Sequence, residues 1–152
     1  MSAVPRPKVN YVVAARRHDT DARTLQALGR TANAGQLFGL AMECGLKALL
    51  IAAGVTPDLD GSVPNRHKFR KHMPELAKLV DMDNIHDDLI SEGLLFTRYL
   101  AMIPGRADFN NWSVDQRYWH DAALPLADLP AWAAAAAEMG RMLDQAMQDG
   151  VL

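Results

Sequence analysis

Apolar residues recur every three or four positions along most of the chain, and this spacing predicts α-helices. The first predicted helix begins after Asn10, whose side chain suits an N-cap, and ends at Gly29, which suits the left-handed turn that follows many helices. Its apolar face consists of Tyr11, Ala15, His18, Ala22 and Leu25. No stretch alternates apolar and polar residues as β-strands do, so we expect an all-α fold.

The segment from Asn33 to Gly54 is apolar almost all round, yet Glu43 and Lys47 lie at its centre. Asn33 followed by Gln36 resembles a capping box and predicts the start of a second helix. A helix that is apolar on more than one side packs on more than one side, so we expect this helix at the centre of the fold. An acid and a base are stable there only if each has a partner.

Prolines and glycines divide the rest of the chain into shorter segments. Three further helices are predicted, over residues 72–80, 85–101 and 128–148. Pro74 sets the start of the first of these near His72 or Met73, because proline is tolerated in the first turn of a helix. Residues 1–9 are expected to be flexible, and residues 103–130 form a long, aromatic-rich connection. We therefore expect one domain over residues 1–152, an up-and-down bundle of four to five helices.

The composition limits the classes of function that fit this bundle. With 152 residues and 49% hydrophobic content, the chain is long enough to bury one substantial core. The formal net charge of -2 argues against a protein that coats nucleic acid through its overall field. The single cysteine, Cys44, cannot form an internal disulfide, which indicates a reducing compartment. No secretory signal or membrane-spanning stretch is evident, so we expect a soluble, cytoplasmic protein.

A dense group of basic and histidine side chains lies between residues 66 and 72. Its members are Arg66, His67, Lys68, Arg70, Lys71 and His72. They directly precede a predicted helix start, whose unpaired amides also attract anions, so phosphate is the expected ligand class. The alternative is a solvated loop whose charges offset nearby acidic residues. Zinc is not expected, because the positive charge and the lack of cysteine or carboxylate ligands disfavour it, and we expect no cofactor.

Glu43 and Lys47 are four residues apart with the acid first, the favourable order for a pair on a helix. The structural interpretation is that they pair with each other or tie the helix to a neighbour. The functional interpretation is that they form the polar floor of a ligand pocket, with Arg98 or Arg117 as a partner.

A second group of candidate residues lies in the long connection: Trp112, Arg117, Tyr118, Trp119 and His120. Aromatic faces beside a guanidinium group could stack a nucleobase and hold its phosphate. Aromatic residues also anchor long loops on a bundle, and this interpretation is the one we favour. A dimer contact is the third alternative, because Trp, Tyr and Arg are enriched at interfaces.

The order of the first elements resembles the start of a HEPN domain, a helical bundle named after nucleotide binding in higher eukaryotes and prokaryotes. The residues that carry the resemblance are Asp21-Ala22, Leu25, Ala34, Leu37, Gly39, Ala41, Glu43, Leu46-Lys47-Ala48-Leu49-Leu50, His72, Leu76 and Leu79. It covers roughly residues 10–80, and the last helix more loosely.

The resemblance implies a bundle that is often a homodimer and that binds nucleotides or cleaves RNA without a metal. RNA-cleaving members carry an arginine and, four to six residues later, a histidine, a spacing that Arg66 and His72 match. In that role His72 would be the base, Arg66 the phosphate clamp and His67 the acid. We expect a binding module for a nucleotide or RNA phosphate. The alternative is a metal-independent, toxin-like endoribonuclease, with a nucleotidyltransferase-like protein as a possible partner.

Overall fold

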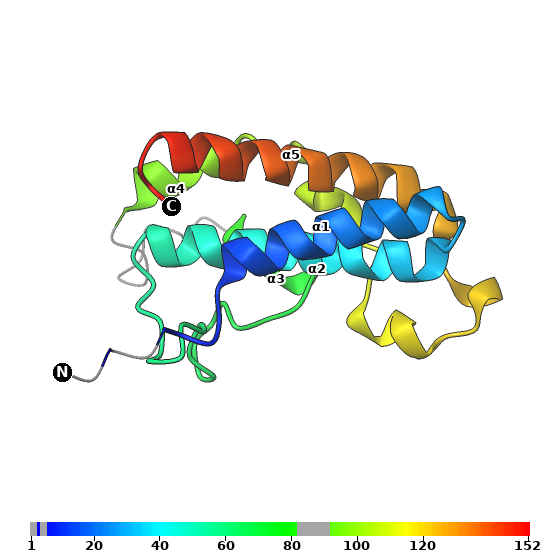
Figure 1. Cartoon of the computed structure of the whole chain (residues 1–152), viewed down its shortest axis with the longest axis horizontal. Coiled ribbons are helices and arrows are strands. Elements are labelled where there is room, and N and C mark those ends of the chain that lie inside the picture. Colours follow the sequence, from blue (N-terminus) through cyan, green and yellow to red (C-terminus); the bar gives the residue numbers. More distant parts are fainter. Residues whose placement is uncertain (1–2, 4–5, 82–91) are drawn as a thin grey trace.

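The computed structural model describes residues 3, 6–81 and 92–152 of the chain. Helix α1 (Tyr11–Ala27) and helix α2 (Thr31–Ala52) form an antiparallel pair that is joined by a short turn (Figure 1). The Asn10 side chain accepts a hydrogen bond from the Val13 amide at 3.0 Å, and Gly29 has a φ of 75°. Both predicted ends of the first helix are therefore confirmed.

The predicted capping box at Asn33 is wrong, because α2 begins two residues earlier, at Thr31. The turn after α1 is so tight that Arg30 already accepts the first helical hydrogen bond, from the Ala34 amide. Gln36 is used differently, since its side-chain amide donates to the Val114 carbonyl at 3.3 Å. The start of α2 has no side-chain cap and is set by the turn itself.

Helix α2 is the centre of the fold, as its composition predicts. It packs against α1 on one side and against α5 (Leu129–Gln148) on another, and every residue from Ala41 to Leu50 is buried. In the described part of the chain, α2 is long and apolar enough to cross a membrane, but 72% of its most apolar stretch is buried inside the bundle. Burial in the core accounts for this composition and fits a soluble protein.

Helix α5 follows the predicted range, whereas α3 (Glu75–Val80) is shorter than predicted. Helix α3 starts after Pro74, because Met73 and Pro74 still form a turn. Helix α4 (Gly93–Leu100) lies within the fourth predicted range, and residues 85–91 of that range lie outside the described residues. Among the described residues there is no strand, so the all-α prediction is confirmed.

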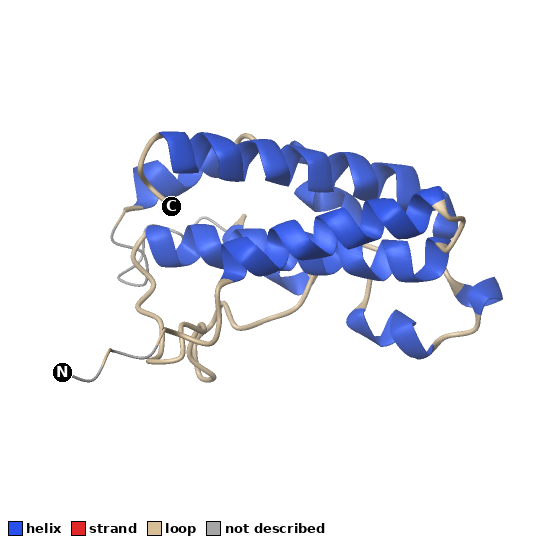
Figure 2. Ribbon diagram, in the orientation of Figure 1, coloured by secondary structure: helices blue, strands red, loops and turns tan. Residues whose placement is uncertain are grey.

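The connection between α4 and α5 is a series of 3₁₀ turns (Figure 2). These turns are η2 (Pro104–Phe109), η3 (Val114–Tyr118), η4 (Asp121–Ala123) and η5 (Leu126–Asp128). Trp112 anchors the connection, because its ring is 1% exposed and its Nε1 donates to the Gly35 carbonyl at 2.9 Å. The anchoring prediction is thus correct for Trp112 and wrong for Tyr118 and Trp119, whose side chains lie on the surface.

Gly39 allows Trp112 to lie directly on α2. A Cβ atom at position 39 would lie 1.9 Å from Trp112 Cε2, so the ring would have to move. We expect Gly39→Ala to lower the free energy of unfolding by about 1–3 kcal/mol, as overpacked cores do. Gly140→Ala is the matched control, because nothing lies within 4 Å of its added Cβ, and it should stabilise α5 by about 0.5–1 kcal/mol. Urea denaturation of the two variants measures both effects, and equal stabilities would contradict the packing described here.

Candidate functional site

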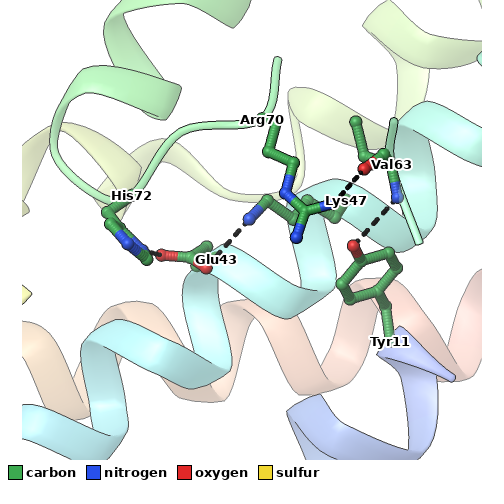
Figure 3. Close-up of polar contacts among 6 residues, drawn as sticks. All are labelled: Tyr11, Glu43, Lys47, Val63, Arg70 and His72. Atoms are coloured by element: carbon green, nitrogen blue, oxygen red, sulfur yellow. Dashed lines mark hydrogen bonds and ion pairs between the residues drawn. The ribbon is translucent and has the colours of Figure 1, made fainter. Parts of the chain in front are cut away.

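A buried carboxylate connects the core of the bundle to the surface loop of residues 66–72. Glu43 Oε1 lies 2.8 Å from His72 Nδ1, and Glu43 Oε2 lies 3.0 Å from Lys47 Nζ. Figure 3 shows the three side chains in a row, with Glu43 in the middle, where the loop passes over α2. We call Glu43, Lys47 and His72 the Glu43 network.

Both charged residues of α2 are buried and paired. Glu43 and Lys47 are each 6% exposed, and each carboxylate oxygen of Glu43 has its own nitrogen partner. The structural interpretation is confirmed, because the two residues pair with each other and Glu43 also holds the loop through His72. The predicted arginine partners are wrong, because Arg98 lies against Asp149 at 3.5 Å and Arg117 belongs to η3, where it lies over Tyr118.

The Glu43 network determines how the His72 ring is presented. A carboxylate that is paired with an ammonium group accepts hydrogen bonds, so Nδ1 of His72 carries the proton that it donates to Glu43. Nε2 is therefore the ring nitrogen left for a ligand: it accepts a hydrogen bond in the neutral ring and donates one, as a phosphate oxygen requires, in the charged ring. The His72 side chain is 59% exposed, so a ligand can reach it from solvent.

The loop that carries His72 is held to α1 by its backbone. The Tyr11 hydroxyl accepts a hydrogen bond from the Val63 amide at 3.0 Å, and Arg70 donates to the Val63 carbonyl at 2.7 Å (Figure 3). Lys47 Nζ lies 5.9 Å from the centroid of the Tyr11 ring, which connects this clamp to the Glu43 network. Phe69, which is 2% exposed, anchors the middle of the loop in the core. Sequence reasoning did not assign Tyr11 to the site.

The predicted basic group divides into residues that hold the loop and residues that face solvent. Arg70 belongs to the first kind because it supports the Val63 carbonyl, and Lys68 lies half-buried with its Nζ 5.9 Å from the Phe69 ring. Arg66 and Lys71 are exposed, and Lys71 makes only a long contact of 4.0 Å with Glu75.

His67 is not suited to the acid role that the HEPN resemblance implies. Its Nδ1 accepts a hydrogen bond from the Phe69 amide at 3.1 Å, and the two rings stack with centroids 5.5 Å apart. Burial lowers the pKa of His67 below its usual value, which keeps the ring neutral at pH 7. The predicted attraction of an anion by the unpaired amides of the helix start is also small. Helix α3 has only six residues, and its Leu76 amide already donates to the His72 carbonyl.

Two further titratable groups lie close enough to Glu43 to feel its charge. Burial, followed by the charge of Arg17, lowers the pKa of His18, while Asp21 and Glu43 oppose this effect. The sequence pattern puts His18 on the apolar face of the first helix and gives it no role in the site. Its position seven residues after Tyr11, on the same helix face, is the signal that connects it to the site. Burial raises the pKa of the Cys44 thiol to about 11, with Glu43 adding to the effect, so Cys44 is an unreactive core residue.

The predicted site residues therefore form two groups, which lie on different segments. The Glu43 network and the loop of residues 66–72 come together, whereas Arg117 and Tyr118 belong to η3, at some distance along the bundle (Figure 1). Within the described ranges, no group of three or more His, Cys, Asp or Glu side chains is arranged to hold a metal ion.

Comparisons of this chain with family models, with curated proteins and with solved structures found no match. The HEPN resemblance therefore stays a prediction from the residues quoted above.

Removal of the Glu43 carboxylate should strand the Lys47 charge in the core. We expect Glu43→Leu to lower the free energy of unfolding by about 3–5 kcal/mol, the usual cost of breaking a buried ion pair. The double variant Glu43→Leu/Lys47→Met should recover most of this loss, because it leaves no buried charge. Thermal denaturation of the three proteins measures the coupling, and an unchanged melting temperature for Glu43→Leu would show that the carboxylate has no structural role.

Proposed function

We propose that this protein is a HEPN-like binding module that holds the phosphate of a nucleotide or of RNA on the loop of residues 66–72 without catalysis. One observation carries the proposal. His72 is exposed and held by the buried Glu43, while Arg66 and Lys71 extend into solvent from the same loop.

The loop suits phosphate because its geometry is set before a ligand arrives. The hydrogen bonds of Tyr11 and Arg70 to Val63 and the burial of Phe69 hold the loop on the bundle. A binding group that is already ordered loses less conformational entropy when the ligand binds. The outward side chains supply the charge, which must be local because the net charge of the whole chain is -2.

The HEPN resemblance adds an oligomeric state and a partner protein to this proposal. It favours a homodimer, and a nucleotidyltransferase-like protein as a partner. The single buried cysteine and the burial of α2 support a soluble, cytoplasmic protein.

Binding to the loop should depend on salt in proportion to the number of phosphate contacts. We expect the double variant Arg66→Ala/Lys71→Ala to bind a labelled single-stranded RNA more weakly and to lower the slope of log K against log salt by about 1.4, since each contact contributes about 0.7. Arg141→Ala, which removes one exposed charge from α5, is the control and should leave affinity and slope unchanged. Fluorescence anisotropy at several salt concentrations measures both quantities. Equal losses for the control and the loop variant would exclude a site on the loop.

The geometry of His72 favours a second candidate function, a metal-independent endoribonuclease. A histidine whose Nδ1 is held by a carboxylate presents Nε2 as a base, as required to remove the proton from a 2′-hydroxyl. The 2′-oxygen would attack the phosphorus, the bond to the 5′-oxygen would break, and a 2′,3′-cyclic phosphate would form as a solvent proton reaches the leaving oxygen. Arg66 would stabilise the charge of the transition state.

A cleavage assay separates the binding module from the nuclease. For a binding module, we expect the purified protein in EDTA to leave single-stranded RNA as intact as the His72→Ala variant does. Gel electrophoresis of end-labelled RNA gives the measurement. Cleavage by the wild-type protein that is lost in His72→Ala would contradict the binding role and establish the nuclease.

A further inference from the structure

Two connections project from the same side of the helix bundle. In Figure 1, the loop of residues 66–72 and the turn η3 both extend below the α1–α2 pair, one toward each end of it. The first carries the proposed phosphate site. The second carries Arg117, Tyr118 and Trp119, which we call the aromatic ledge.

The two aromatic rings of the ledge are exposed, although other large aromatic side chains of the fold are buried. The Tyr118 side chain is 77% exposed and that of Trp119 is 46% exposed, whereas Trp112 and Trp132 are each 1% exposed. The guanidinium of Arg117 lies over the Tyr118 ring, 4.8 Å from its centroid. Large aromatic residues that serve only to anchor a loop are buried, as Trp112 is.

The base of the aromatic ledge is ordered by contacts that do not involve the exposed rings. The Trp112 Nε1 donates to the Gly35 carbonyl of α2, and the buried Gln116 donates to the Asn111 carbonyl. The Ser113 side chain caps η3 by accepting a hydrogen bond from the Asp115 amide at 3.2 Å. The exposed rings are thus displayed from a fixed platform.

We propose that the aromatic ledge stacks the bases of a single-stranded RNA whose phosphates lie on the loop of residues 66–72. This inference rests on the proposed function and adds a substrate class to it. Every base has a flat face that stacks on Tyr or Trp, and the Arg117 guanidinium extends the flat surface of Tyr118. A duplex keeps its bases stacked on one another, so the aromatic ledge selects unpaired strands.

The charges around the aromatic ledge assign it a different energetic role from that of the loop. Asp115 and Asp121 are exposed on either side of it and offset the charge of Arg117, so its field attracts a phosphate backbone less than the field of the loop does. Its contribution is stacking, which depends little on salt. The loop contributes charge, which depends strongly on salt. The two surfaces can therefore be distinguished in one titration.

The test compares oligonucleotide length and salt dependence in matched variants. We expect Trp119→Ala and Tyr118→Ala to weaken binding of a single strand of about 12 nucleotides at least about fivefold, within the range measured for base stacking, with the salt slope unchanged. A dinucleotide, which occupies the loop alone, should bind the wild type and the variants at Tyr118 and Trp119 equally. Trp119→Phe is the matched control and should keep most of the affinity, because it retains a flat aromatic face.

Intrinsic fluorescence gives a second readout, because Trp119 is the exposed one of the three tryptophans in the sequence. Addition of the longer strand should quench the emission of the wild-type protein and protect Trp119 from acrylamide. Both effects should disappear in Trp119→Phe.

Several outcomes would overturn the inference. If Trp119→Ala and Tyr118→Ala bind the longer strand as the wild type does, while Arg66→Ala/Lys71→Ala does not, the aromatic ledge has no part in RNA binding and the phosphate proposal stands. Equal affinity for duplex RNA would exclude base stacking, and a loss of dimer without a loss of RNA affinity in Trp119→Ala would assign these residues to a subunit contact. If the wild-type protein binds no RNA of either length, both proposals fail.

Discussion

One buried carboxylate, that of Glu43, attaches a surface loop of this protein to its core. Its two oxygens are divided between Lys47 on the same helix and His72 on a loop 29 residues away in sequence. Neither charged residue of α2 would be stable in the core without such partners. The loop of residues 66–72 therefore lies across α2. The proposed site lies there because the buried carboxylate is stable only with His72 and Lys47 as partners.

The packing of α2 is the second constraint on the site. Gly35, Gly39 and Gly45 lie where Trp132, Trp112 and Met139 press against the helix, so both α5 and the α4–α5 connection approach its backbone closely. This close approach holds the connection in place from Trp112 onward. As a result, η3 projects from a rigid support, on the same side of the bundle as the loop (Figure 1).

The two proposed binding surfaces differ in the part of a nucleic acid that each would contact. The loop offers exposed cations and a His72 ring whose Nε2 faces away from Glu43 and donates a hydrogen bond when the ring is charged, which suits phosphate. The aromatic ledge offers flat, exposed rings among acidic residues, which suits bases. Neither requires the chain as a whole to be basic, which agrees with its net charge of -2.

Local spacing in the sequence was sufficient to predict the helices that build the core. The Asn10 cap, the central place of α2 and the extent of α5 follow from patterns within a few turns of helix. The start of α2 was predicted incorrectly because the turn at Gly29 begins the helix before Asn33 is reached.

The sequence by itself also determined that Glu43 and Lys47 are buried and need partners, because one helix carries both and is apolar almost all round. Only the tertiary structure decided that His72, and neither Arg98 nor Arg117, completes the pair. It likewise decided that Trp112 is buried while Tyr118 and Trp119 are exposed. The partner of Glu43 and the burial of each aromatic side chain depend on where the chain returns to the bundle. Such contacts between residues distant in sequence are set by tertiary packing, which no local pattern encodes.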